Sequence, residues 1–229
     1  INPALTRELP YDTQRAFTPV TLSAELPNAL VVNPSLAART VKELIALAQT
    51  RPGQLNFASS GIGNATHLAA ELFRSATNVQ IVHVPYKSGG FALTAIIAGE
   101  VQFYFATLPS ALPHINGGRL RALAVTTVRR SSAAPQLPTM HEAGLPGFEV
   151  TSWYGILVPA GTPAVIVAKL NKDIVATLKD PQVRSQIAAQ GADPVGNSAA
   201  EFNSFISREL VKWAKLIKEA NIKAEPGGA

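Results

Sequence analysis

Hydrophobic residues recur with two alternating periods through the middle of the chain. Short runs rich in β-branched and aromatic residues predict buried strands, and the stretches between them, with apolar positions every three to four residues, predict amphipathic helices. The predicted order is strand 55–59, helix 65–76, strand 79–84, helix 90–99, strand 101–105, helix 108–117 and strand 120–126. Strands that alternate with helices of about ten residues are typical of βαβ units, so we predict a mostly parallel sheet covered by helices on both faces.

The flanking segments are richer in helix than in strand. We predict short strands at 17–22 and 28–32, and one or two strands within 147–158. Capping residues and apolar spacing predict four further helices: one after the N-cap Thr40, one over 163–178 with Thr162 as N-cap, one from Asp180 to residue 190, and one over 198–220.

This pattern divides the chain into two lobes. A complete α/β lobe is expected over 30–126, whereas 1–29 and 127–229 form a second lobe with many helices and few strands. A sheet of two or three strands leaves its edges unpaired, so we interpret this lobe as incomplete, with an N-terminal portion missing. The chain opens at Ile1 without a charged and then apolar leader, which fits a mature, trimmed or truncated product.

Composition narrows the class of protein. Of the 229 residues, 47% are hydrophobic and 15% are charged, which is typical of a globular chain. No apolar run is as long as the roughly 18 residues that a membrane span needs. The basic residues behind the net charge of +5 stand singly except for Arg129-Arg130, which disfavours nucleic-acid binding and fits a small anionic ligand. The chain has no cysteine, so disulfides and thiolate chemistry are excluded.

The most informative stretch joins a predicted strand to a helix through a loop rich in glycine and hydroxyl groups. Glycine lets the backbone approach a ligand closely, and the helix directs unpaired N–H groups and the positive end of its dipole at the loop. This combination predicts a site for a small anion. The candidate ligand-binding residues here are Ser59, Ser60, Gly61, Gly63, Asn64, Thr66 and His67. We expect this loop to bind the ligand through its backbone N–H groups and the hydroxyls of Ser59, Ser60 and Thr66.

The same pattern returns about twenty residues later. The predicted strand 79–84 is followed by a second small-residue loop and another helix, and the candidate residues of this loop are Tyr86, Lys87, Ser88 and Gly89. Thr107 follows the next strand and is a further candidate, because ligands in open α/β sheets bind beyond the carboxyl ends of the strands. If the strands are parallel, the two loops should lie side by side.

Catalysis remains an alternative. Ser59 or Ser60 with His67 would supply the nucleophile and base of an acyl-transfer hydrolase. However, residue 58 is Ala, so the segment is not a G-x-S-x-G elbow, and neither loop contains an acidic residue. The serines can equally cap loop and helix N–H groups.

No motif predicts a metal or a cofactor. The four histidines are dispersed, without an H-x-x-x-H pair or clustered carboxylates. Gly61 and Gly63 form a single G-x-G, and Thr66 stands where a dinucleotide loop has its third glycine. Structural packing is the favoured interpretation of His83, whereas His67 is expected to be more open because it lies in the first helical turn.

Collinear segments along the whole chain resemble the substrate-binding proteins of tripartite tricarboxylate transporters, the Bug receptors. The segments that carry the resemblance are INPAL (1–5), LPYD (9–12), FTPVTL (17–22), VVNPSL (31–36), FASSG (57–61) with THLA (66–69), VHVPYK (82–87), LPSALPHI (108–115) and LPTMHEAG (137–144). The chain departs from the family pattern at Ser88 and Phe91, where glycine and proline are more frequent, and at Ala106-Thr107, where an acidic or amide pair is frequent. These departures bear on the identity of the ligand.

The resemblance implies a periplasmic receptor of type II periplasmic-binding-protein architecture. Its two lobes, the first incomplete here, would close around a small carboxylate and deliver it to membrane transporter subunits, with no cofactor and no chemical step. Family members usually carry about a hundred further residues before the segment that matches Ile1, including a loop that clamps one end of the ligand. Besides the hydrolase, a pure interaction module without a small ligand remains a third interpretation.

Overall fold

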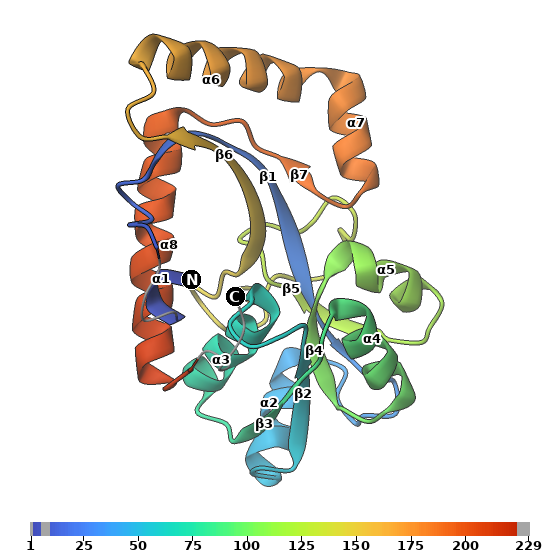
Figure 1. Ribbon diagram of the computed structural model, residues 1–229. Coiled ribbons are helices and arrows are strands. Elements are labelled where there is room, and N and C mark those ends of the chain that lie inside the picture. The colour runs from blue at the N-terminus through green and yellow to red at the C-terminus, as the bar shows by residue number, and fades with distance from the viewer. Residues whose placement is uncertain (1, 6–9, 224–229) are drawn as a thin grey trace. The chain divides into compact units, whose positions relative to one another are not determined.

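The computed structural model describes residues 2–5 and 10–223 (Figure 1). Contacts divide the described chain into two compact units. One comprises residues up to Leu26 together with those from Trp153 onward, and the other comprises Pro27–Ser152. Residues 127–152 were expected in the first of these units, but their contacts group them with the second.

The Pro27–Ser152 unit is built on a sheet with the strand order β3-β2-β4-β1-β5. Strand β2 pairs in parallel with β3 and β4, and β1 pairs antiparallel with β4 and β5. The strands are β1 (Phe17–Val32), β2 (Leu55–Ser59), β3 (Ile81–Pro85), β4 (Phe103–Thr107) and β5 (Arg121–Val125), and the helices are α2 (Val41–Thr50), α3 (Ala65–Thr77), α4 (Gly89–Ala98) and α5 (Leu108–Asn116).

Side chains of β4 alternate between two layers of core. Tyr104 and Ala106 belong to an apolar cluster shared with Ile96 of α4 and Leu108 of α5. Phe103 and Phe105 point the other way, where each packs against Phe73 of α3. The expected α/β sandwich, with helices on both faces of the sheet, is therefore confirmed.

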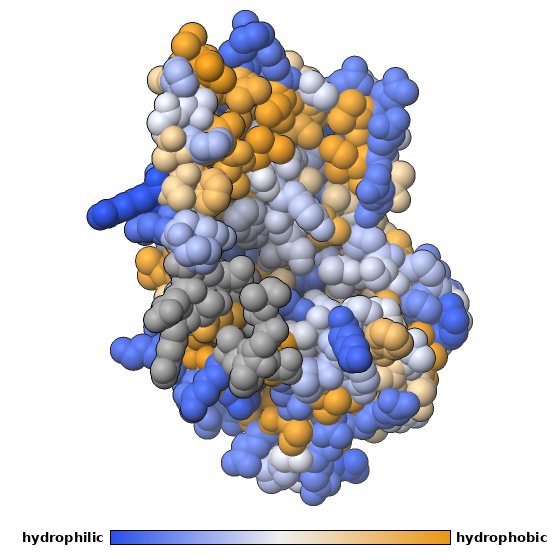
Figure 2. Space-filling model, viewed as in Figure 1, coloured by the Kyte–Doolittle hydropathy of each residue, from blue (hydrophilic) through white to orange (hydrophobic). Residues whose placement is uncertain are grey.

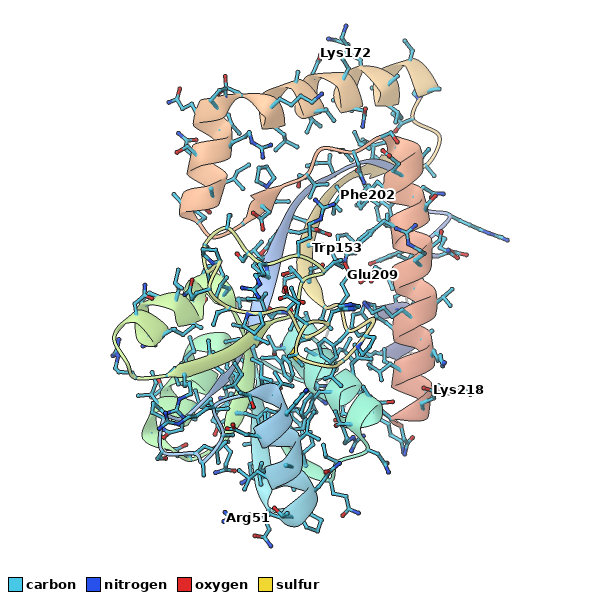
Figure 3. The ribbon with its side chains drawn as sticks, turned by 180° about the vertical axis from the view of Figure 1, so that it is seen from behind. Arg51, Trp153, Lys172, Phe202, Glu209 and Lys218 are labelled. Carbon is cyan, nitrogen blue, oxygen red and sulfur yellow. The ribbon has the colours of Figure 1, made fainter. Side chains whose placement is uncertain are left out.

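The other unit contains β6 (Thr151–Pro159), β7 (Asp193–Pro194), α1 (Asn2–Leu5), α6 (Ala164–Lys179), α7 (Pro181–Ala189) and α8 (Ala199–Glu219), and the first part of β1 pairs with β6 and β7. Helix α8 packs directly on β6: a Cβ at Gly155 would lie 2.0 Å from the Phe202 ring. The indole N–H groups of Trp153 and Trp213 both donate to Glu209, at 3.4 and 2.7 Å. Figure 3 shows Trp153 of β6 beside Phe202 and Glu209 of α8.

This unit also exposes a large amount of apolar surface, part of which is visible in Figure 2. Tyr154 and Ile156 of β6 and Val165 and Ile166 of α6 are all more than a third exposed. Monomeric soluble proteins rarely leave extensive apolar surface in the open, so the surface of this unit is unusually apolar.

Two details of the predicted elements are wrong. Residues 17–22 and 28–32 form one strand, β1, because the residue before Pro27 is held in an extended conformation that continues the strand. Thr162 does not cap α6: its hydroxyl donates to the Pro159 carbonyl at 2.7 Å, and Pro163 is the N-cap residue. By contrast, the predicted caps Thr40, Asp180 and Ser198 are confirmed.

Helices in the described part of the chain are all too short or too polar to cross a membrane.

Candidate functional site

Three loop–helix junctions meet at one edge of the β3-β2-β4 sheet. Strands β3, β2 and β4 are neighbours and run in parallel, so the loops that follow them emerge at the same edge. The Tyr86 N–H donates to the Ser59 carbonyl at 3.0 Å. The prediction that the two candidate loops lie side by side is therefore confirmed.

The backbone N–H groups of the first loop are occupied by side chains of the protein itself. Those of Ser60, Gly61 and Gly63 donate, in that order, to Thr66 Oγ1 at 3.0 Å, to Ser59 Oγ at 3.2 Å and to His67 Nδ1 at 3.0 Å. The expectation that this loop offers its backbone N–H groups to a ligand is therefore wrong for these three residues, since each donor already has an acceptor.

Asn64 caps the amino end of α3. Its Oδ1 accepts from the N–H groups of Thr66 and His67, at 3.0 and 3.1 Å, and from the Thr66 hydroxyl at 2.6 Å. Its Nδ2 donates to Ser60 Oγ at 2.7 Å. The Thr66 proton is thus committed to Asn64, so the Ser60 hydroxyl is the donor to Thr66 Oγ1 at 3.1 Å. Because a hydroxyl can rotate, this proton can turn from Thr66 to a ligand.

The amino end of α4 lies beside Ser60 and is not capped. Its N-cap residue Ser88 makes no side-chain capping bond, and Gly89 and Gly90 open the helix. A Cβ at Gly89 would lie 3.4 Å from the Tyr104 hydroxyl and 3.9 Å from Ser60 Cβ. Uncapped N–H groups, the positive end of a helix dipole and nearby hydroxyls together suit an anion.

Tyr104 is a site residue that sequence reasoning missed. It is buried, and its hydroxyl lies beside Ser60 and Thr66. Burial raises the pKa of Tyr104, an effect that the Ser60 and Thr66 hydroxyls oppose, so the phenol remains neutral. In the sequence, Tyr104 stands within the aromatic run Phe103–Phe105, a pattern that by itself predicts a core residue. Its role in the site becomes visible only in the structure, where β4 places the Tyr104 hydroxyl beside Ser60.

His67 and His83 form a stacked pair behind the first loop. Their ring centroids are 3.9 Å apart with an interplanar angle of 11°, and Phe57 stacks on His83 at 4.8 Å. Burial, aided by the nearby His67 and Arg74, lowers the pKa of His83 from 6.5 to about 3, so this ring is neutral near pH 7. His67 is 4% exposed, so the expectation that it is the more open ring is wrong.

This arrangement does not assemble a hydrolase. His67 uses Nδ1 to accept the Gly63 N–H, and its Nε2 faces Glu71 Oε1 at 3.6 Å. The histidine that contacts a serine is His83, with Nε2 2.7 Å from Ser59 Oγ, but Ser59 is fully buried and a base with a pKa of about 3 is weak.

The remaining candidates lie nearby with different degrees of exposure. Lys87 is exposed on the second loop, and the Thr107 hydroxyl donates to Ser110 Oγ at 2.9 Å before α5.

Asn28 pairs with Thr107 across β1 and β4. Its side-chain amide is buried, and neither polar atom has a partner among the described residues, a signal that the sequence did not show.

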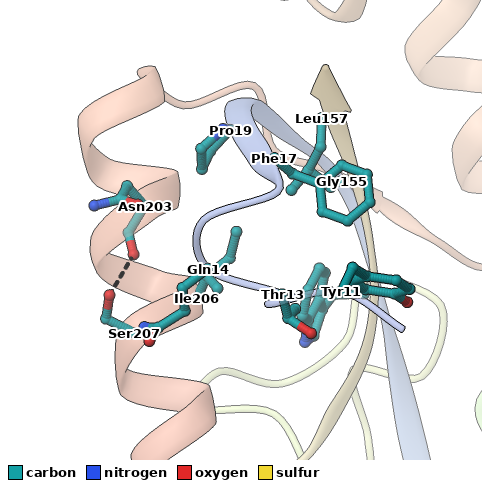
Figure 4. A pocket seen from close by; sticks show the side chains of 11 residues that line it. Tyr11, Thr13, Gln14, Phe17, Pro19, Gly155, Leu157, Asn203, Ile206 and Ser207 are labelled. Atoms are coloured by element: carbon teal, nitrogen blue, oxygen red, sulfur yellow. Dashed lines mark hydrogen bonds between the residues drawn. The ribbon is translucent and has the colours of Figure 1, made fainter. Parts of the chain in front are cut away.

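A separate cavity of about 420 Å³ lies in the other unit, between β6, α8 and the segment that leads into β1 (Figure 4). Its lining is mainly apolar, from Tyr11, Phe17, Trp153, Leu157 and Ile206, with amide and hydroxyl groups but no basic side chain. This lining does not suit a carboxylate.

Across the described chain, no three His, Asp or Glu residues are grouped in a way that could hold a metal ion.

The fold and the site define an α/β solute-binding protein rather than an enzyme. The family model described as tripartite tricarboxylate transporter family receptor matches residues 1–222. The chain therefore belongs to this receptor family, as the resemblance in its motifs implied.

Two relatives match almost the whole chain. A protein of Pseudomonas sp. (strain P51) from the tcbD-tcbE intergenic region is 37% identical over 94% of this chain, and the protein BugT of Bordetella pertussis is 36% identical over 96%. The chain spans 65% and 68% of their lengths, about two thirds.

Two of the similar solved structures are complexes with carboxylates. R. palustris Rpa4515 with adipate is 37% identical, with a TM-score of 0.83 over 96% of this chain and 74% of that one. MatC from Rhodopseudomonas palustris with bound malate is 29% identical, with a TM-score of 0.78 over 94% and 74%. The structural likeness supports the type II periplasmic-binding-protein fold.

Proposed function

We propose that this chain acts in the periplasm as a receptor for a small carboxylate, which it passes to the membrane subunits of a tripartite tricarboxylate-type transporter. The single observation that carries the proposal is the uncapped amino end of α4 beside the Ser60 and Tyr104 hydroxyls. A carboxylate there would satisfy helix N–H groups that have no side-chain cap. The adipate and malate complexes of similar proteins support this class of ligand.

Recognition in this proposal needs no chemical step. The Ser60 hydroxyl and the N–H groups at Gly89 and Gly90 donate to the carboxylate, and Tyr104 holds Ser60 in place. Hydrogen bonds to a charged acceptor contribute about 1.5–3 kcal/mol each, so the loss of one donor should lower the affinity about tenfold or more. The exposed Lys87 adds a positive charge at the rim, where it favours the approach of an anion.

Titration calorimetry with adipate and with malate tests the proposal. We expect weak binding by the unaltered chain, which spans about two thirds of the length of its relatives. The affinity should be about tenfold or more lower for Ser60→Ala, because one charge-assisted donor is lost. Ser75→Ala on the exposed part of α3 is the matched control and should bind as the unaltered chain does. Equal affinity in Ser60→Ala and Ser75→Ala would remove Ser60 from the site.

A further inference from the structure

Two histidines from different elements stack on each other under the first loop, with His67 buried and His83 half-buried. His67 comes from the first turn of α3 and His83 from the middle of β3. With the rings 3.9 Å apart and nearly parallel, the pair forms a plate under the first loop, extended by Phe57. Aromatic packing alone does not require histidine at either position.

The hydrogen bonds explain why histidine is needed at 67. A backbone N–H can only donate, so the bond from Gly63 N to His67 Nδ1 at 3.0 Å requires an unprotonated Nδ1. The ring proton must then lie on Nε2, which faces Glu71 Oε1 at 3.6 Å. Arg74 Nη2 forms an ion pair with Glu71 Oε2 at 2.6 Å, although its N–H is not aligned as a hydrogen bond.

His83 acts on the other end of the same loop. Its Nε2 lies 2.7 Å from Ser59 Oγ, and that oxygen accepts the Gly61 N–H at 3.2 Å. Each imidazole therefore anchors a different glycine N–H, one directly and one through Ser59. The lowered pKa of His83 keeps this ring uncharged beside its stacked neighbour.

We infer that His67 and His83 are a positioning pair, in which two neutral stacked rings anchor both ends of the loop Ser59–Gly63 and so present Ser60 to the ligand at the α4 amino end. The inference deepens the proposed function and rests on it for the role of Ser60. The pair acts through the loop and touches no ligand.

Matched substitutions separate the hydrogen bonds from the stack. His67→Phe and His83→Phe keep an aromatic ring and lose the nitrogen, whereas His67→Asn and His83→Gln place an amide oxygen or nitrogen near the lost Nδ1 or Nε2. We expect each Phe variant to lower adipate affinity about three- to tenfold, the effect of one neutral hydrogen bond. The amide variants should recover most of this loss.

Two readouts do not depend on a ligand. Nitrogen-15 NMR should show an unprotonated Nδ1 and a protonated Nε2 on His67 at neutral pH. Hydrogen exchange at the Gly63 amide should be faster in His67→Phe and slow again in His67→Asn, and the Gly61 amide should follow the His83 variants in the same way.

The outcomes are distinct. If the unaltered chain binds neither adipate nor malate, the proposed function is wrong, and the tautomer and exchange measurements still decide the positioning pair. If it binds, but the Phe variants bind equally well or the amide variants recover nothing, the positioning pair is wrong and the receptor function stands. A proton on Nδ1 of His67 would also overturn the inference.

Discussion

Helices α3 and α4 follow neighbouring parallel strands and begin at loops of similar small-residue composition, but their amino ends are in opposite states. At α3, Asn64 accepts from the N–H groups of Thr66 and His67. At α4, Ser88 makes no side-chain cap, and Gly89 and Gly90 bring no side chain that could supply one. The comparison shows that a strand–loop–helix pattern does not by itself make an anion site, because the cap residue decides whether the donors are free.

The largest effect should come from covering the α4 amino end. Gly89→Val places a branched side chain against the Tyr104 hydroxyl, where the added Cβ lies at 3.4 Å, and shields the first N–H groups of the helix. Losing two charge-assisted hydrogen bonds should lower carboxylate affinity about 100-fold or more, as measured by calorimetry with adipate.

Ala65→Val, at the first position of α3, is the matched control for that change. Because the α3 amino end is already capped, affinity should stay within about threefold of the unaltered chain. A large loss in Ala65→Val together with a small loss in Gly89→Val would reverse the roles of the two helices.

The next effect concerns pH and the stack under the first loop. The pKa of His83 is lowered from 6.5 to about 3, so its neutral form stabilises the fold fully above pH 6.5, and this contribution is lost as the pH falls towards about 3. After allowance for solvent screening of the half-buried ring, we expect a loss of about 1–3 kcal/mol over this window.

Urea denaturation at several pH values measures that loss. His83→Gln should flatten the pH dependence in this window, because its amide does not titrate. An unchanged slope in the variant would show that other groups cause the acid instability.

A smaller effect is expected from removing the α3 cap. Asn64→Ala leaves the N–H groups of Thr66 and His67 without their acceptor and should lower the free energy of unfolding by about 1 kcal/mol. Asn64→Asp keeps the acceptor and should restore stability, which chemical denaturation can check. Stability in Asn64→Ala equal to that of the unaltered chain would mean that the cap contributes nothing.

Much of the fold was predictable from local patterns. The runs at 55–59 and 65–76 correspond to β2 and α3, because apolar periodicity and capping residues act within a few positions. Parallel strand order then placed the two loops together. The continuous strand β1 was not predictable from its local pattern, because Pro27 and Asn28 interrupt the run of strand-forming residues, although an X-Pro step is compatible with an extended chain.

Which polar groups of the site are free to bind a ligand was not predictable in the same way. Whether Gly61 has a free N–H depends on Ser59, which is held by His83 at a separation of 24 residues in the chain. The Tyr104 hydroxyl was hidden in an aromatic strand, and the buried Asn28 amide becomes visible only when its register with Thr107 is known. Such contacts are set by tertiary packing and leave no local periodicity.

The most direct test of the central claim is to give α4 the cap that it lacks. In Ser88→Asp, a carboxylate at the N-cap position can accept from the first N–H groups of α4 and interact with its dipole. We predict that this variant unfolds at a higher temperature and binds adipate at least about tenfold more weakly, because its own carboxylate occupies the anion site. Unchanged adipate affinity in a folded Ser88→Asp chain would contradict the account.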